Sequence, residues 1–226
     1  ISVEVNSNTT FDKVAYIPNY QNKYGQGYDG ADEWTNIDYA GGFWGGDYDP
    51  MWEAFDGRRF ISNGYADESW GPAFDGEDYT PWYAIWKDSP YYGQTAKWEA
   101  RPDNIKNFYD TGVTLKNSFA ISGAGDGYTA RLAYTNLDQT GIIPASDFKR
   151  NTISGNFDFD ATDKLSVGVN FSFYNQTVNG DFDDGYSNQT TGSFNAWFAR
   201  DVDVSKMREL KDLQTDGGYS ASWNVW

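Results

Sequence analysis

Four ten-residue segments near the middle of this 226-residue chain alternate apolar and polar side chains almost without interruption. The segments span residues 113–122, 128–137, 151–160 and 165–174. In the last of them, Leu165, Val167, Val169, Phe171 and Phe173 alternate with Ser166, Gly168, Asn170 and Ser172. A period of two residues sustained over about ten residues is what a membrane-crossing β-strand requires, because one face meets lipid and the other meets water. The pattern therefore predicts four strands, each with two chemically different faces.

The connections between these segments alternate in length, and this bears on which β fold they form. A soluble β-sandwich produces the same alternation of side chains, so periodicity alone leaves that fold open. Residues 123–127 and 161–164 are short turns, whereas 138–150 is a longer loop and 17–111 precedes the first of the four strands. Short turns on one side and long loops on the other are typical of bacterial outer-membrane barrels. We therefore predict an all-β fold: a segment of a large antiparallel transmembrane β-barrel with long extracellular loops.

The composition excludes several kinds of chemistry. The chain has 33 acidic and 17 basic residues, a formal net charge of -16, so charge does not favour binding to nucleic acid. It contains no cysteine and no histidine, which excludes disulfides, Ser-His-Asp and Cys-His triads, and ordinary zinc sites. Carboxylates remain, but close acidic pairs such as Asp47 and Asp49 are expected by chance in so acidic a chain. We therefore expect no enzymatic activity and no cofactor.

The alternating pattern divides the chain into four regions. Residues 1–16 hold a further strand, residues 17–111 a long aromatic and acidic loop region, and residues 112–175 the four antiparallel strands. Residues 176–226 form a second loop region with one short helix at about 203–213 and a truncated next segment. Because the smallest single-chain barrels use about eight strands, we expect the missing strands to come from a longer polypeptide.

The loop region 17–111 carries most of the candidate binding residues. Glycine and proline interrupt it, as in Gly71-Pro72, so long helices or strands are not expected there. Its density of aromatic residues argues against disorder, and we predict a folded layer packed on its own rings. A minority of aromatic side chains is expected to touch a substrate or partner. The candidates for such contacts are Trp70, Trp82, Trp86 and Trp197, together with Arg131 on the polar face of the strands.

Two short motifs invite a ligand, and neither is specific. Asp181, Asp183 and Asp184 offer hard oxygen ligands for calcium, but the run lacks the spacing of a twelve-residue calcium loop. A plain turn is the favoured interpretation, so calcium is an unsupported cofactor. Residues 25–30 match the dinucleotide pattern G-x-G-x-x-G, but no helix is expected after them, and nucleotide binding is therefore not predicted.

The order of longer phrases along the chain is more specific than either motif. The phrases are residues 18–27, 69–76, 107–112, 131–136, 141–144, 149–151 and 195–201. Together they resemble the SusC/RagA family of TonB-dependent outer-membrane transporters, and the resemblance extends over nearly the whole chain.

The resemblance implies that the chain is part of a larger transport complex. It places Ile1 just after the plug domain of a large plugged barrel. Such a barrel lies in the outer membrane of a Gram-negative bacterium, and its long loops are extracellular. The resemblance also implies active import of glycans or peptides, with a SusD-like surface lipoprotein as partner, TonB coupling through the absent plug region, and outer-membrane lipid around the strands. No nucleic-acid partner is implied. Two alternatives stay open: a soluble extracellular carbohydrate-binding β domain and a passive porin. The sequence does not identify the substrate.

Overall fold

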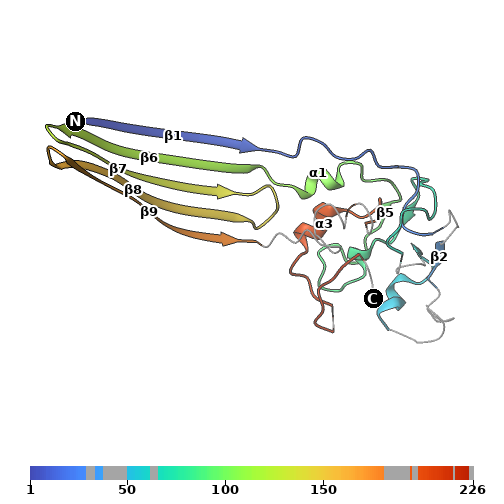
Figure 1. The fold of residues 1–226 in the computed structure, drawn as a ribbon. Helices are drawn as coiled ribbons and strands as arrows, with labels where there is room; N and C mark the ends of the chain where they lie inside the picture. The colour runs from blue at the N-terminus through green and yellow to red at the C-terminus, as the bar shows by residue number, and fades with distance from the viewer. Residues whose placement is uncertain are drawn as a thin grey trace. The chain divides into compact units, whose positions relative to one another are not determined.

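The computed structural model describes residues 1–28, 34–37, 50–61, 66–180, 194, 198–215 and 217–223. The chain divides into two compact units (Figure 1). The first, here called the sheet unit, comprises Ile1–Ala15 and Tyr109–Phe182. The second, the loop unit, comprises Tyr16–Phe108 and Asp183–Trp226. In the described part of the chain strand accounts for 46% and helix for 10%, which confirms a predominantly β fold with antiparallel sheets.

The sheet unit is one five-stranded antiparallel sheet in the order β1-β6-β7-β8-β9. The strands are β1 (Ser2–Asp12), β6 (Gly112–Gly125), β7 (Tyr128–Thr140), β8 (Asp147–Thr162) and β9 (Leu165–Asn179). Four of them form a meander, and β1 pairs with the outer edge of β6. The described strands form an open sheet (Figure 1).

The strands are longer than the alternating pattern predicts, and the connections are correspondingly shorter. The turns are reduced to Asp126-Gly127 and Asp163-Lys164, and the predicted loop at 138–150 shrinks to 141–146. Gly127 has φ 72°, in the left-handed region that glycine adopts without steric cost. The extra strand residues, which include Phe148 and Val178 among polar neighbours, do not alternate apolar with polar and so carry no period of two.

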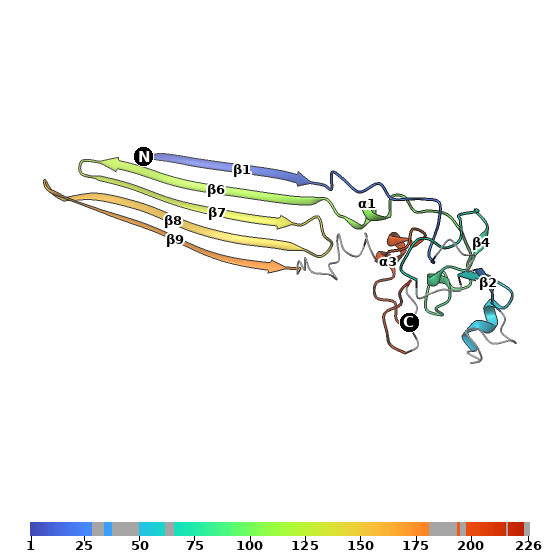
Figure 2. The same ribbon diagram turned by 45° about the vertical axis from the view of Figure 1, so that its right-hand side comes forward.

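The described part of the loop unit contains only short elements, as its glycine and proline content predicts (Figure 2). Two small antiparallel ladders pair β2 (Trp34–Asn36) with β3 (Arg59–Ile61), and β4 (Asp78–Tyr79) with β5 (Ala96–Lys97). The helical elements are the 3-10 turns η1 (Pro50–Phe55) and η2 (Trp82–Ala84), and the helices α1 (Asn104–Phe108) and α3 (Val204–Glu209). No helix in the described part of the chain is long and apolar enough to cross a membrane.

Aromatic rings form the core of the loop unit. Trp98 is 0% exposed, and the rings of Trp34, Phe74 and Tyr79 surround it at centroid distances of 4.7, 5.1 and 5.1 Å. Its indole N–H donates to the carbonyl of Ala73 at 3.1 Å, which satisfies the one polar atom of the ring. The described part of this unit is therefore a folded layer packed on its own rings.

The helix α3 is shorter than the predicted 203–213, and its start is fixed by two side chains. Asp203 is the N-cap, and its carboxylate accepts hydrogen bonds from the backbone N–H groups of Ser205 and Lys206 at 2.9 and 3.2 Å. Asn104 of α1 accepts from the N–H of Val204 and donates to the carbonyl of Val202. These bonds tie α1 to α3 across nearly a hundred residues of sequence.

Candidate functional site

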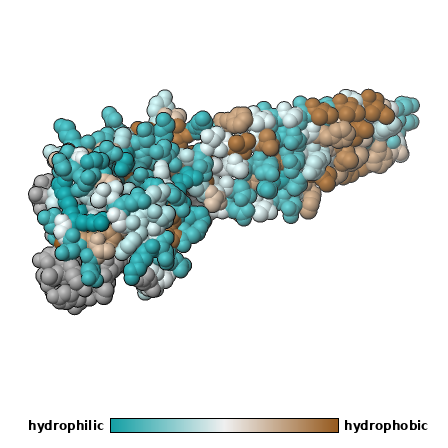
Figure 3. All heavy atoms as spheres, turned by 180° about the vertical axis from the view of Figure 1, so that it is seen from behind, coloured by the Kyte–Doolittle hydropathy of each residue, from teal (hydrophilic) through white to brown (hydrophobic). Residues whose placement is uncertain are grey.

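One face of the five-stranded sheet is apolar over the half that lies nearest the two-residue turns. The register forms four neighbouring rows that run across the strands. Within each row, an apolar residue of one strand lies opposite an apolar or glycine residue of the next strand. These side chains are largely exposed, for example Phe173 at 66%. Figure 3 shows apolar residues gathered over this end of the strands. The residues on this face include Phe119, Ile121, Tyr128, Leu132, Tyr134, Ile153, Phe157, Phe159, Val167, Val169, Phe171 and Phe173.

A row of four asparagines and one serine ends the apolar region on that same face. The row consists of Ser7, Asn117, Asn136, Asn151 and Asn175, one residue from each strand. Neighbours are hydrogen-bonded: Ser7 donates to Asn117 at 2.7 Å, and Asn136 donates to Asn151 at 3.0 Å. We call it the amide row. The alternation predicts that Val113 lies on the apolar face. It does lie on that face, opposite Thr140, but on the far side of the amide row from the apolar region.

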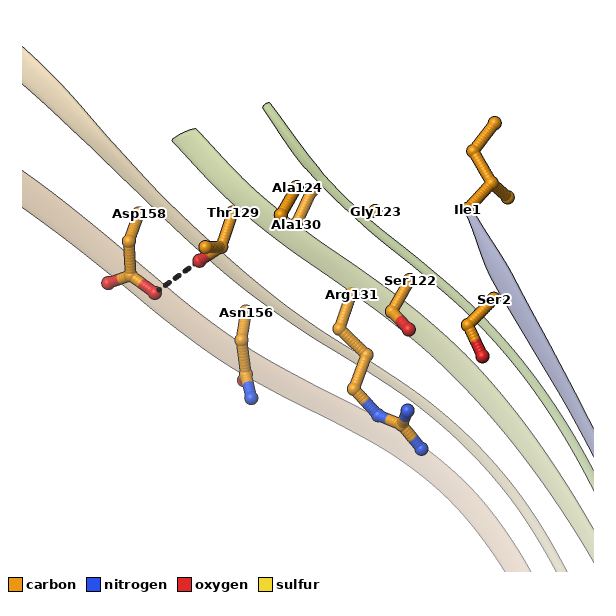
Figure 4. A pocket seen from close by; sticks show the side chains of 10 residues that line it. All are labelled: Ile1, Ser2, Ser122, Gly123, Ala124, Thr129, Ala130, Arg131, Asn156 and Asp158. Carbon is orange, nitrogen blue, oxygen red and sulfur yellow. Dashed lines mark hydrogen bonds between the residues drawn. The ribbon is translucent and has the colours of Figure 1, made fainter. Parts of the chain in front are cut away.

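The opposite face carries polar and small residues over the same half of the strands, and here the structure places Arg131. Farther from the two-residue turns, Leu137, Phe148 and Val178 also lie on this opposite face. Figure 4 shows Ser2, Ser122, Arg131, Asn156 and Asp158 pointing to one side of the sheet. They line a shallow hollow of about 510 Å³. The Arg131 guanidinium donates to both carboxylate oxygens of Glu4, at 2.9 and 2.8 Å. Arg131 therefore already has an anionic partner within the sheet.

In the loop unit, three phrases far apart in the sequence meet at one junction. Gly25 donates to the carbonyl of Pro72, and Gly71 donates back to the carbonyl of Gly25, both at 3.1 Å. A Cβ on Gly71 would lie 2.0 Å from the carbonyl oxygen of Gln26, so only glycine allows these two backbones to approach.

The third phrase joins through side chains. The N–H of Gln26 donates to the Asp201 carboxylate at 2.8 Å, and the N–H of Arg200 donates to Ser69 Oγ at 3.0 Å. Residues from 18–27, 69–76 and 198–201 thus form one structural unit, although nothing in their spacing predicts that they touch.

Asp201 is the buried acid of this junction. Burial raises the pKa of its carboxyl to about 6, against the opposing effects of the Gln26 hydrogen bond and of the Arg101 and Arg200 charges. The group is 8% exposed and serves as a backbone anchor rather than as a free acid.

A cavity of about 320 Å³ opens beside the junction. The described residues that line it include Tyr20, Asp67, Glu68, Trp70, Phe198 and Arg200. Trp70 is 55% exposed, and its ring lies 5.8 Å from that of Tyr24. Arg200 is 4% exposed, and its guanidinium carbon lies 4.5 Å from the centre of the Tyr20 ring. The cavity combines an aromatic surface, a buried cation and two carboxylates.

Of the described residues that the sequence predicted to touch a ligand or partner, only Trp70 lines this cavity. Trp82 packs between two core clusters, with its ring 5.7 Å from Tyr83, and Trp86 packs against the cluster around Phe55 and Ile85. Both indole nitrogens are buried without a hydrogen-bond partner among the described residues. Arg131 belongs to the sheet unit. Trp197 and the calcium candidates Asp181, Asp183 and Asp184 lie outside the described residues.

Arg200 is the cavity residue that the sequence reasoning missed. Its signal is a cation placed two residues after the aromatic pair Trp197 and Phe198 and directly before the acid Asp201. Among the described residues, no group of three or more acidic side chains is arranged to hold a metal ion. No model of a known protein family matches the chain, and no curated protein matches it significantly.

Proposed function

We propose that this chain is part of an outer-membrane active importer of the SusC/RagA type, which takes up glycans or peptides together with a SusD-like surface lipoprotein and TonB. In this proposal the five strands are one sector of the barrel wall, the apolar face meets lipid, and the polar face lines the water-filled interior. The loop unit lies outside the cell, where it meets the substrate or the lipoprotein. The chain performs no covalent chemistry.

The observation that carries the proposal is the apolar region bounded by the amide row. From Leu165 to Phe173, β9 extends over roughly 27 Å at about 3.4 Å per residue. A strand tilt of 35–45° reduces this to roughly 20 Å, close to the apolar band of about 25 Å that outer-membrane barrels present. Aromatic rings stand at both limits, Tyr128 and Phe159 at one and Tyr134 and Phe173 at the other. Such rings are typical of the two membrane interfaces.

The exposure of this face argues against the soluble alternative. In a β-sandwich the apolar face of one sheet packs against a second sheet. Here the side chains of Phe119, Leu132 and Phe171 are each more than 40% exposed, and no described element covers them. Exposed apolar surface of this extent requires a lipid or protein neighbour.

The sheet edges support membership of a larger barrel. Among the described strands, β1 and β9 each pair on one side only. Unpaired backbone groups are not tolerated in hydrocarbon, because no water satisfies them. Further strands of the same polypeptide must therefore complete the wall. A folded loop unit with its own core and cavity also favours a selective importer over a passive porin.

Affinity purification of the full-length protein from its own host tests the proposal. We expect a chain that sediments with the outer membrane, requires detergent for extraction and co-purifies with a lipid-anchored protein. Deletion of the protein should abolish uptake of one glycan or peptide, and so should collapse of the proton-motive force. A water-soluble monomer, or uptake that continues without the proton-motive force, would contradict active import through a barrel.

A further inference from the structure

The cavity of the loop unit contains a buried cation that forms no ion pair among the described residues, although the charge of the adjacent Asp201 acts on it. The Nη2 atom of Arg200 is buried and has no hydrogen-bond partner among the described residues. Arg200 also forms none of the ion pairs found in the described part of the chain. A buried charge without a partner is destabilising, and such a group in a folded protein usually has a ligand, an ion or a water in its working state.

The surroundings of Arg200 hold the guanidinium in place without satisfying it. The Tyr20 ring lies 4.5 Å from the guanidinium carbon, and the backbone N–H of Arg200 is fixed by Ser69. Burial lowers the pKa of the guanidinium, whereas Tyr20 and the adjacent Asp201 raise it. Arginine stays protonated in proteins, so the site keeps its positive charge and its fork of donors suits a carboxylate.

Other walls of the same cavity carry negative charge and an aromatic surface. Asp67 and Glu68 line it, and Trp70 presents a half-exposed ring. Burial and the neighbouring Glu68 charge raise the pKa of Asp67, and a bound cation would offset both effects. The volume of about 320 Å³ is at the small end of the range for ligand pockets.

We propose that this cavity binds a short zwitterionic peptide, with its carboxylate paired to Arg200, its ammonium toward Asp67 and Glu68, and an apolar side chain on Trp70. The charge arrangement favours this ligand over an acidic sugar, whose negative charge would be repelled by the two carboxylates. A neutral sugar would offer the Arg200 guanidinium no ion-pair partner. The inference rests on the proposed function and selects peptides from its two substrate classes.

Calorimetric titration of the purified full-length protein in detergent tests the site with three matched probes. The probes are the dipeptide alanyl-phenylalanine, its C-terminal amide, and its N-acetyl derivative. We expect the dipeptide to bind, and each blocked form to bind roughly ten-fold or more weakly, because each loses one charge-assisted contact.

Three variants locate the contacts. Arg200→Met should abolish the difference between acid and amide, and it should fold because it removes a buried charge whose Nη2 has no hydrogen-bond partner among the described residues. Trp70→Ala, at an exposed position, should weaken all three probes. Lys97→Gln removes a positive charge from an exposed ion pair with Asp78, outside the cavity, and should change nothing.

The inference is overturned if the amide binds as tightly as the acid, if no probe binds, or if trigalacturonate binds and the dipeptide does not. Binding is measured without transport, so the two proposals fail separately. Dipeptide binding without energised import would contradict the proposed function alone. Import in the absence of dipeptide binding would contradict only this site.

Discussion

At the residue scale, the loop unit depends on a few buried polar groups that hold distant segments together. Asp201 fixes Gln26, Ser69 fixes Arg200, and Asn104 bridges α1 and the start of α3. Each bond joins residues that are far apart in the sequence. Such contacts are not periodic, and no local pattern in the sequence indicates them.

Asp201 makes the stability of the loop unit depend on pH, and the direction of this dependence follows from its pKa. Its pKa is about 6 in the folded chain, above the usual value of about 3.9 expected on unfolding. Protonation of this group therefore stabilises the fold fully below about pH 4, and that contribution is lost as the pH rises through about 6. The shift corresponds to a cost on the order of 3 kcal/mol at neutral pH.

We expect Asp201→Asn to remove this pH dependence. The asparagine oxygen can still accept from the Gln26 N–H, so the variant should equal the wild type near pH 4 and exceed its stability at pH 8. Tryptophan fluorescence during denaturation measures this, since β1 and β6–β9 contain no tryptophan and the signal comes from the loop unit. A variant that is less stable than the wild type at pH 8 would show that the charged anchor is net favourable.

At the element scale, the sequence predicts the strands well where one face is apolar and poorly where apolar and polar residues stop alternating. The alternation in residues 165–174 located β9, but the strand continues to Asn179 through residues of which only Val178 is apolar. Backbone pairing with β8 maintains the strand beyond the apolar region. The helix near residue 203 was predicted because a capping residue precedes apolar residues at helical spacing. Only six residues of the predicted range are helical.

The two faces of β9 should respond differently to a charge. Val169→Arg places a guanidinium on the apolar face, which should cost roughly 2–4 kcal/mol if the site is near the bilayer midplane. Ser172→Arg, on the polar face of the same strand, should be close to neutral. Urea unfolding of the full chain in lipid vesicles compares them. Equal effects at the two positions would mean that the faces do not differ in environment.

The cap of α3 should be worth a measurable part of the stability of the loop unit. Asp203→Ala removes the acceptor for two backbone N–H groups and should cost about 1 kcal/mol. Asp212→Ala, at an exposed position beyond the helix, is the matched control and should have little effect. Tryptophan fluorescence during denaturation reports both. Equal stability of the two variants would show that Asn104 alone fixes the start of the helix.

At the scale of the whole molecule, the chain combines one regular and one irregular unit, and they differ in how far the sequence predicts them. The sheet follows from a two-residue period, so its faces and strand order could be predicted. In the loop unit, the sequence predicted an aromatic core but not which rings form it. Trp82 and Trp86 are partly buried against the core clusters, and the burial of Arg200 depends on segments distant in sequence.

The central claim is that the apolar face of the sheet meets lipid up to the amide row. The chain has no cysteine, so nitroxide labels can be attached at single introduced cysteines without background. The measurement is the collision rate of each label with oxygen and with a water-soluble nickel complex, in the full-length protein reconstituted into bilayers. The variants are Val169→Cys, Asn170→Cys, Phe173→Cys and Asn175→Cys on β9. The account predicts that oxygen dominates at 169 and 173, and nickel at 170. It also predicts nickel at 175, which shares the apolar face but lies in the amide row. Two results would contradict the account. Labels at 169 and 173 could collide with neither reagent, as they would under a second packed sheet, or they could collide with the nickel complex as readily as the label at 170.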